Sequence, residues 1–242
     1  MPPMQGCCGT AEGGNLAPAR SGQEAAVADG RCPDMDDASL FATPDGAATL
    51  DALRQDLATR NDLPDWAAAA TQAVFGEGPV GADLLLVGEQ PGDEEDRAGR
   101  PFVGPAGRLL DRALAEAGIA RDAAYVTNAV KHFKFTPTGR RRLHQGPNAG
   151  DIAYYRPFLR REIALVGPRL LVSLGATALR ALTGKPLAVT RVRGEVTQDM
   201  DARPLLPTIH PSYLLRLPDA EAKEREYARF LADLRLARRE VG

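Results

Sequence analysis

Short apolar runs alternate along the chain with longer segments in which apolar residues recur every three or four positions. Four runs are continuous, at residues 83–88, 124–130, 169–175 and 205–209. Continuous runs of this length are typical of strands buried on both faces of a parallel sheet. The helical periodicity predicts helices at residues 106–117, 151–166, 176–182 and 221–238, and another that begins near Thr49.

The order of these elements predicts the fold class. Strands that alternate with helices imply right-handed crossovers, which place helices on both faces of the sheet. We therefore predict an α/β fold, a three-layer α/β/α sandwich around a central parallel sheet of four strands. We assign residues 47–242 to this domain. Residues 1–46 lack apolar periodicity and are rich in Gly, Ala, Pro and Asp, so we expect a disordered acidic tail there.

Composition excludes several classes of protein. No apolar run approaches the ~20 residues that span a bilayer, and the start of the chain lacks the features of a secretory signal. The three cysteines, at positions 7, 8 and 32, all precede the predicted domain. This leaves no disulfide framework and no cysteine metal site within the domain. We expect a cytoplasmic protein, and a monomer because nothing in the sequence indicates an interface.

The net charge of −2 argues against a nucleic-acid partner until its distribution is considered. Residues 1–50 hold seven acidic and two basic residues, so the rest of the chain is net positive. Residues 131–144 hold five Lys or Arg and no acid. A run of this kind is either a solvated basic loop or a surface that binds phosphates.

Polar or glycine-rich loops follow all four predicted strands. GEQPGDEED follows the first strand, Asn128 lies at the end of the second, LGATA follows the third, and His210-Pro211-Ser212 follows the fourth. In an open parallel sheet these loops emerge at the carboxyl edge, where such folds bind ligands. We therefore predict a functional site at this edge.

Several residues in and near these loops have two interpretations. Phe102 lies among turn residues and is either a local hydrophobic plug or a platform on which a base stacks. Asn128 either caps its strand or pairs with the edge of a pyrimidine. Pro211 restricts His210 to extended geometry, which points the imidazole out of the strand end. His144 is either a surface-loop residue or a nucleophile whose neutral form is favoured by three neighbouring arginines.

Together these residues closely resemble the uracil-DNA glycosylase superfamily, in its family-4 branch. The matching segments are residues 89–92, 101–114, 125–135, 174–178 and 208–212, within a similarity that runs from about residue 70 to the C-terminus. Two features resemble the UdgX-type members, which bind uracil-DNA covalently. One is Gln90. The other is the sequence RRRLH at residues 140–144, which that group writes as Lys-Arg-Arg-Ile-His.

The resemblance implies that the protein removes uracil from DNA, preferentially single-stranded, and that His144 then becomes joined to the deoxyribose. It implies that the base leaves with help from His210. The candidate residues are His144, Glu89, Asp93 and His210 for catalysis, Gln90, Phe102 and Asn128 for uracil binding, and Lys131, Lys134, Arg140, Arg141, Arg142 and Ser212 for DNA binding.

The chain departs from this family at one group of positions. Relatives carry a four-iron–four-sulfur cluster, and its cysteine positions align here with Asn61, Pro64 and Tyr155. We therefore predict that the protein has no cluster and no other metal cofactor. We also expect that packing by aromatic residues, Trp66 and Tyr154 among them, replaces the cluster.

Two other functions stay open. An ordinary glycosylase would turn over many times and release free abasic DNA. A protein that has lost both cluster and activity would only bind DNA, although the joint presence of Glu89, Gln90, Asn128 and His210 weighs against this. The RRRLH sequence favours covalent capture over ordinary turnover.

Overall fold

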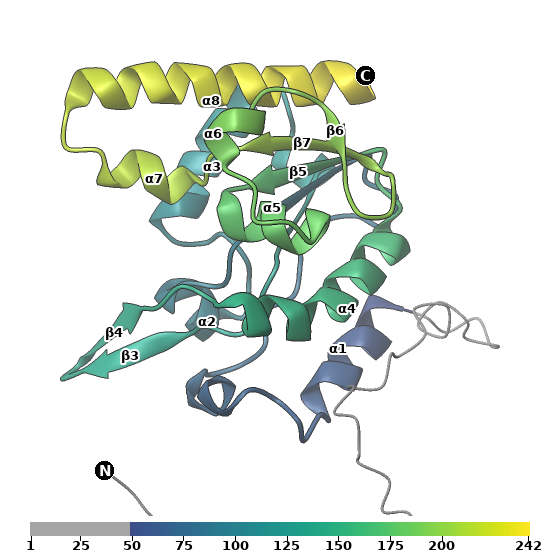
Figure 1. Cartoon of the computed structure of the whole chain (residues 1–242), viewed down its shortest axis with the longest axis vertical. Coiled ribbons are helices and arrows are strands. Elements are labelled where there is room, and N and C mark those ends of the chain that lie inside the picture. Colours follow the sequence, from purple (N-terminus) through teal and green to yellow (C-terminus); the bar gives the residue numbers. More distant parts are fainter. Residues whose placement is uncertain (1–48) are drawn as a thin grey trace, which may run out of the picture. The chain divides into compact units, whose positions relative to one another are not determined.

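The computed structural model describes residues 49–242, which are arranged around one mostly parallel sheet (Figure 1). The predicted acidic tail and the three cysteines lie outside the described residues. The sheet has the order β2-β1-β5-β7-β6. Its strands are β1 (Leu84–Gly88), β2 (Tyr125–Asn128), β5 (Leu170–Leu174), β6 (Thr197–Gln198) and β7 (Pro204–Thr208).

The four predicted strands are confirmed, and all of them run parallel. The chain passes from β1 to β2 on one side and then crosses to β5 on the other side of β1. The strand order therefore reverses at β1, and such a switch point opens a crevice at the carboxyl edge. The fifth strand, β6, was not predicted; it pairs antiparallel with β7 and its two exposed residues carry no apolar pattern.

Helices cover both faces of the sheet. The helices are α1 (Leu50–Ala58), α2 (Asp93–Ala98), α3 (Pro105–Glu116), α4 (Ala149–Val166), α5 (Ala176–Thr183), α6 (Val189–Val192), α7 (Pro211–Arg216) and α8 (Ala220–Val241), with short 3-10 helices η2 (Asp65–Ala69) and η3 (Arg121–Ala123). Successive strand residues face opposite layers. Leu84 and Leu86 pack with α3 and α8, whereas Leu85 and Val87 pack with α4 and α5. The three-layer sandwich is confirmed.

Some elements were not predicted because they bury little apolar surface of their own. Helix α2 has the sequence DEEDRA, which contains no apolar periodicity, and it ends at Gly99 with a φ of 69°. Strands β3 (Phe135–Thr138) and β4 (Arg141–His144) form an antiparallel hairpin within the run predicted as a basic loop. Most of the hairpin is exposed, so neither strand shows an alternating pattern. Among the described helices, none is both long and apolar enough to cross a membrane.

One ion pair is completely buried beneath the carboxyl edge. Lys131 Nζ lies 2.5 Å from Glu162 Oε2, and both side chains are fully excluded from solvent. Glu162 also accepts hydrogen bonds from the Tyr125 and Thr127 hydroxyls at 2.9 and 2.8 Å. Lys131 donates to the carbonyl oxygen of Asn128 at 2.7 Å. Burial lowers the pKa of Lys131, and the adjacent Glu162 carboxylate opposes that shift.

This pair generates the first prediction. Replacing Lys131 with Met leaves the Glu162 carboxylate buried without its cation, so we expect the free energy of unfolding to fall by about 3–5 kcal/mol. Urea denaturation followed by circular dichroism measures this. The control is Arg225→Met, which removes an exposed pair with Glu221 and should change stability by less than about 1 kcal/mol. Equal losses in the two variants would contradict the prediction.

Candidate functional site

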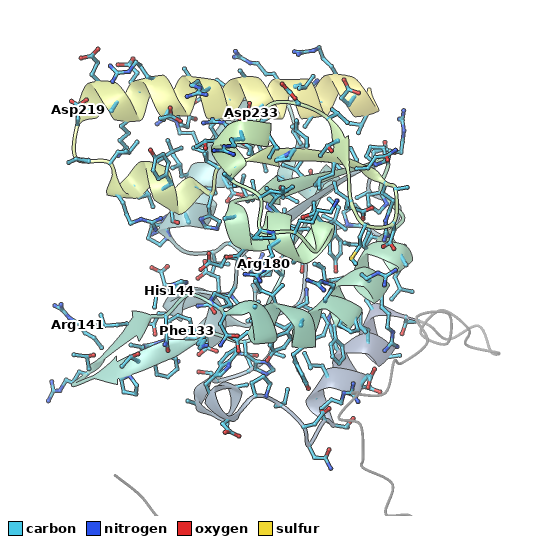
Figure 2. All side chains as sticks on the ribbon, in the orientation of Figure 1. Phe133, Arg141, His144, Arg180, Asp219 and Asp233 are labelled. Carbon is cyan, nitrogen blue, oxygen red and sulfur yellow. The ribbon has the colours of Figure 1, made fainter. Side chains whose placement is uncertain are left out.

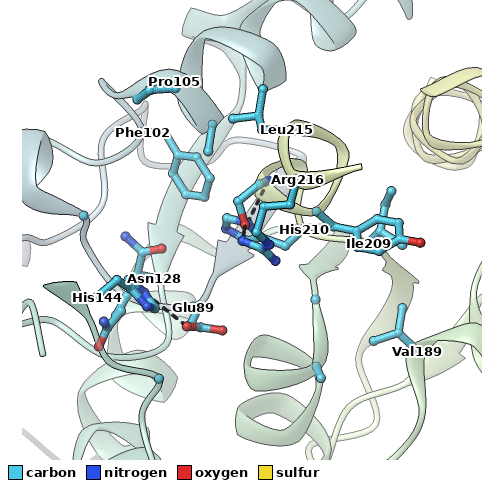
Figure 3. Close-up of a pocket in the computed structure, with 18 of the residues that line it drawn as sticks. Glu89, Phe102, Pro105, Asn128, His144, Val189, Ile209, His210, Leu215 and Arg216 are labelled. Atoms are coloured by element: carbon cyan, nitrogen blue, oxygen red, sulfur yellow. Dashed lines mark hydrogen bonds and ion pairs between the residues drawn. The ribbon is translucent and has the colours of Figure 1, made fainter. Parts of the chain in front are cut away.

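A cavity of about 1260 Å³ opens at the carboxyl edge of the parallel strands. Figure 3 shows Glu89, Asn128 and His144 toward one end of it and Val189 and Ile209 toward the other. The structure brings all the candidate catalytic and uracil-binding residues to this cavity: His144, Glu89, Asp93, His210, Gln90, Phe102 and Asn128. A cavity therefore lies where the sequence predicts the site.

Glu89 lies where the strand order reverses. Its Oε2 accepts a hydrogen bond from the Thr177 hydroxyl in the first turn of α5, at 2.8 Å. Its Oε1 lies 3.3 Å from His144 Nε2. The nearest charged group to this histidine is therefore a carboxylate and not the arginines beside it in the sequence. Glu89 connects the sheet to the hairpin through these two contacts.

Gln90 lines the cavity, but its side-chain amide is already occupied. Nε2 donates to the backbone carbonyls of Lys134 and Gln145, each at 3.1 Å, and Oε1 accepts from the Lys134 N–H at 3.3 Å. These contacts compete with the predicted role of this amide in holding uracil, which stays a prediction. Gln90 instead ties together the two segments that enter and leave the hairpin.

Asp93 also holds the hairpin. Its carboxylate accepts from the Arg142 guanidinium and forms an ion pair with Arg97 at 3.1 Å. The second Arg142 contact is with the buried Asp96, at 2.6 Å. Two guanidinium groups therefore neutralise Asp93. The structure thus gives this residue an anchoring contact with the hairpin, and its predicted catalytic role stays a prediction.

Phe102 is held at the cavity by a strained backbone. Its φ of 55° lies in the left-handed region, which non-glycine residues seldom adopt. Gly107 permits this path, because a Cβ there would overlap the Phe102 carbonyl group. The ring is 7% exposed and its centroid lies 6.0 Å from that of His210. Phe102 thus packs into the core and also presents its ring to the cavity, so the hydrophobic-plug interpretation is confirmed and base stacking stays a prediction.

Asn128 ends β2 with its side chain 2% exposed. Its Oδ1 is buried and has no hydrogen-bond partner among the described residues. A buried carbonyl oxygen without a donor is costly, and native structures seldom leave one without a functional reason. Gly88 lies beneath it, and a Cβ at that position would collide with both Asn128 and Phe102. The amide is therefore fixed in the cavity and ready to meet a donor.

His210 presents one defined nitrogen to its surroundings. The Ser212 backbone N–H donates to His210 Nδ1 at 3.1 Å, so this nitrogen is an acceptor and the ring proton lies on Nε2. The Ser212 hydroxyl lies 2.7 Å from the same nitrogen and accepts from Arg216 at 2.9 Å. The Ser212 hydroxyl therefore orients the histidine, and its predicted DNA contact stays a prediction. Desolvation lowers the pKa of His210 to about 4, and Arg216 and His144 add to this effect.

The hairpin carries His144 at its inner end, paired with Phe135 in the strand register. Figure 2 shows Arg141 farther out along the same hairpin. Arg142 lies over the rings of Phe133 and Phe135, 5.3 and 5.0 Å from their centroids. With its two carboxylate partners, this arginine fixes the hairpin against α2.

The basic run therefore divides into two kinds of residue. Lys131 is fully buried, and Lys134 is 8% exposed and forms an ion pair with Asp151 at 2.6 Å. Arg142 is likewise held by acidic groups, so the charges of these three residues are compensated within the protein, which weighs against their predicted phosphate contacts. Arg140 and Arg141 are exposed at the hairpin tip, where the predicted DNA contact stays a prediction.

The residues present do not fit the iron–sulfur cluster of the family. No cysteine occurs among the described residues, and no group of metal-ligating side chains is found in that part of the chain. Tyr155 is fully buried, and its hydroxyl lies 2.7 Å from His132 Nδ1. The centroids of Trp66 and Tyr154 lie 6.3 and 5.0 Å from that of Tyr155. Aromatic rings therefore pack around a position that the alignment assigns to a cluster ligand.

Two residues with clear structural roles at the site were missed. Glu95 accepts from the backbone N–H groups of Gly92 and Gly104, at 3.1 and 2.8 Å, and so joins the loop after β1 to the loop of Phe102. A Glu three residues after Gly92 at a helix start was a signal that could have revealed it. Thr177 could have been found in the LGATA sequence, but its partner Glu89 is distant in the chain.

Comparisons with known proteins agree with this arrangement. The model of the family "Uracil DNA glycosylase superfamily" matches residues 75–235. A type-4 uracil-DNA glycosylase from Thermotoga maritima is 42% identical over 147 residues, 60% of this chain and 73% of the relative. Those of Sulfurisphaera tokodaii and Pyrobaculum aerophilum are 36% and 38% identical, over 62% and 60% of this chain and 68% and 74% of the relatives.

The fold and the cavity define an α/β protein whose ligand site lies at the switch point of a parallel sheet. Within that class, this chain belongs to the uracil DNA glycosylase superfamily, because the family model matches more than half of its length. The family expected from the motifs is thus confirmed, with type-4 enzymes among its relatives. Its placement in the UdgX-type group stays a prediction.

The buried histidines generate the second prediction. Burial lowers the pKa of His132 to about 4, as desolvation does for His210. We expect two of the three histidine signals in an NMR titration to shift near pH 4, and His210→Gln to lose one of them. Because the folded pKa lies below the unfolded value of about 6.5, stability should fall as the pH drops from about 6.5 to 4. A titration midpoint near pH 6.5 for His210 would contradict both its burial and the assignment of its ring proton to Nε2.

Proposed function

We propose that this protein excises uracil from DNA and captures the resulting deoxyribose through His144. One observation carries the proposal: His144 Nε2 lies 3.3 Å from Glu89 Oε1 in the cavity that Asn128 and His210 also line. Membership of the superfamily and the type-4 relatives support the coarser activity, cleavage of the glycosidic bond of deoxyuridine. The position of His144 supports the further step, which is capture of the deoxyribose.

Uracil must leave the base stack to reach this cavity. The unpartnered Oδ1 of Asn128 can accept from the N3–H of the base, and the ring of Phe102 offers a stacking surface. An unpaired uracil enters without the cost of opening a base pair, which amounts to a few kcal/mol. Single-stranded DNA is therefore the preferred substrate in this proposal.

Cleavage leaves negative charge on the uracil and positive charge on the sugar. The Nε2–H of neutral His210 donates to the departing base, while the Glu89 carboxylate faces the cationic sugar. Both groups are fixed before the reaction by Ser212 and Thr177, respectively. Their favourable interactions grow as the charges separate, which is the condition for acceleration of the chemical step.

Capture follows at the same carbon. The bond between C1′ and uracil N1 breaks with its electron pair on the base, and an imidazole nitrogen of His144 forms the new bond to C1′. The remaining N–H proton of the alkylated ring can pass to Glu89 and from there to the uracil or to solvent. A glycosylated imidazole is a poor leaving group, so the adduct persists and the protein acts once.

The third prediction tests this capture. Incubation with a single-stranded oligonucleotide that contains one uracil should give a band that survives boiling in detergent, in stoichiometric yield. The His144→Ala variant should give none. The matched control is Leu143→Ala, which changes an exposed neighbour on the same hairpin and should retain the adduct.

Other outcomes would distinguish the competing functions. Abasic product in excess of the protein, without a trapped band, would identify an ordinary glycosylase. Unchanged DNA, with equal binding to oligonucleotides with and without uracil, would identify a protein that only binds DNA. Either result overturns the proposed capture.

We also propose that the protein works without an iron–sulfur cluster. The packing of Trp66, Tyr154 and Tyr155 supports this, as does the hydrogen bond from Trp66 Nε1 to Asp151 at 2.8 Å. These contacts stabilise the region that the cluster cysteines occupy in relatives. The absence of cysteine at the three aligned positions adds to this support.

The fourth prediction follows from that proposal. Protein purified without oxygen should contain iron far below one atom per chain and show no brown absorbance near 400 nm, while it still forms the adduct. Elemental analysis of the full chain measures the iron. Stoichiometric iron that is lost together with activity would overturn the proposal.

A further inference from the structure

The cavity is larger than a single base requires. Its volume of about 1260 Å³ exceeds the roughly 300–1,000 Å³ of a site that holds one drug-sized ligand. The proposed uracil site accounts for one end. We call the remaining part, which includes the end marked by Val189 and Ile209 in Figure 3, the second arm, and define it by the lining residues Val189, Thr190, Arg193, Ile209 and Tyr213. The proposed reaction uses none of them.

The second arm offers a partly apolar surface. Val189 and Ile209 supply aliphatic groups at this end (Figure 3). Tyr213, which is 41% exposed, adds an aromatic ring to the cavity lining. An aromatic ring beside aliphatic side chains is the kind of surface on which a nucleobase stacks.

Arg193 gives this surface a polar specificity. Its Nη1 lies 2.6 Å from Glu226 and its Nε 2.7 Å from Asp233, with the side chain 5% exposed. The two carboxylates compensate its charge, so the residue does not select an anion. Its Nη2 is buried and has no hydrogen-bond partner among the described residues. A neutral acceptor such as a base carbonyl or ring nitrogen would satisfy this donor.

Two arginines add positive charge around the second arm. Arg216 donates to the Ser212 hydroxyl, which leaves its charge uncompensated by that contact. Arg229 is 64% exposed and pairs with Glu226 at 2.8 Å. Both line the cavity, and Arg216 lies between its two ends in Figure 3. A phosphodiester that joins two nucleotides could be bound here while their bases occupy the two ends.

We propose that the second arm binds the base of the nucleotide adjacent to the uracil in single-stranded DNA. The inference rests on the proposed function, because the first base defines what is adjacent. In a duplex the neighbouring base is paired and stacked, so a second extrusion adds to the cost of the first. In a single strand the neighbour is already unpaired. The second arm therefore gives a physical basis for a preference for single strands.

Fluorescence anisotropy with the full chain tests this. The probes are single-stranded oligonucleotides with one 2′-fluorinated deoxyuridine, whose glycosidic bond resists cleavage. In matched probes the nucleotide on the 5′ side, or the one on the 3′ side, is an abasic analogue. We expect Kd to rise about tenfold when one of the two neighbouring bases is removed. Removal of the other should have little effect.

A variant whose new side chain fills the second arm provides the second measurement. Thr190 is exposed, so Thr190→Trp should fold and occupy the arm. It should weaken binding of the intact probe about tenfold. With a probe whose recognised neighbour is already abasic, Thr190→Trp should cause no further rise in Kd, because the substitution and the missing base remove the same contact. Leu187→Trp places the same ring on the adjacent exposed segment outside the cavity and should leave Kd unchanged.

The outcomes separate the two proposals. If the protein binds uracil probes selectively but its Kd does not change when either neighbouring base is removed, the role proposed for the second arm is overturned. The proposed function would then still stand. Equal Kd values for uracil and thymine probes would count against the proposed function itself. If Thr190→Trp and the abasic neighbour each weaken binding independently, the second arm does not contact the neighbouring base. That result would also overturn the inference.

Discussion

The buried pair of Lys131 and Glu162 is the constraint on which the site depends. Burial of two charges is costly unless their remaining hydrogen-bonding capacity is filled. Glu162 fills it with Tyr125, Thr127 and the Gly76 N–H, and Lys131 with Thr127 and the Asn128 carbonyl. These contacts join the end of β2, helix α4 and the segment before β1. Asn128 therefore sits on a rigid base, which lets it hold an unpartnered oxygen in the cavity.

The hairpin depends on a second set of charges. An isolated two-stranded hairpin is marginally stable in water, and this one is mostly exposed. Its position is set from outside by Asp93 and Asp96 on α2, which pair with Arg142 of the hairpin, and by Gln90 at its base. His144 thus owes its position to groups that do not belong to the hairpin. The three arginines before it have different roles: one fixes the hairpin and the other two face solvent.

The sequence predicts an element well where the residues of that one segment are enough to show how it is buried. The run LLLV of β1 is apolar throughout because both of its faces are covered, and its position was predicted to within a residue. The role of Lys131 could not be predicted, because its partner Glu162 lies in a helix thirty-one positions away and looks like a polar-face residue. The hydrogen-bond partners of Gln90 could not be predicted for the same reason. The motif places it at the cavity, but only the fold shows that two backbone carbonyls occupy its amide.

The distribution of charge in the cavity explains how one site can serve both halves of the proposed reaction. Asp93 is compensated by arginines, and His210 is neutral because desolvation lowers its pKa to about 4. Among the residues that the structure describes, the close partners of Glu89 are a hydroxyl and an imidazole. In the ground state deoxyuridine carries no charge for these groups to bind. In the proposed reaction, the anionic base meets the Nε2–H of His210 once the glycosidic bond stretches, and the cationic sugar meets Glu89 and the imidazole beside it. On this proposal the site is complementary to separated charge, which is a property of the transition state and not of the substrate.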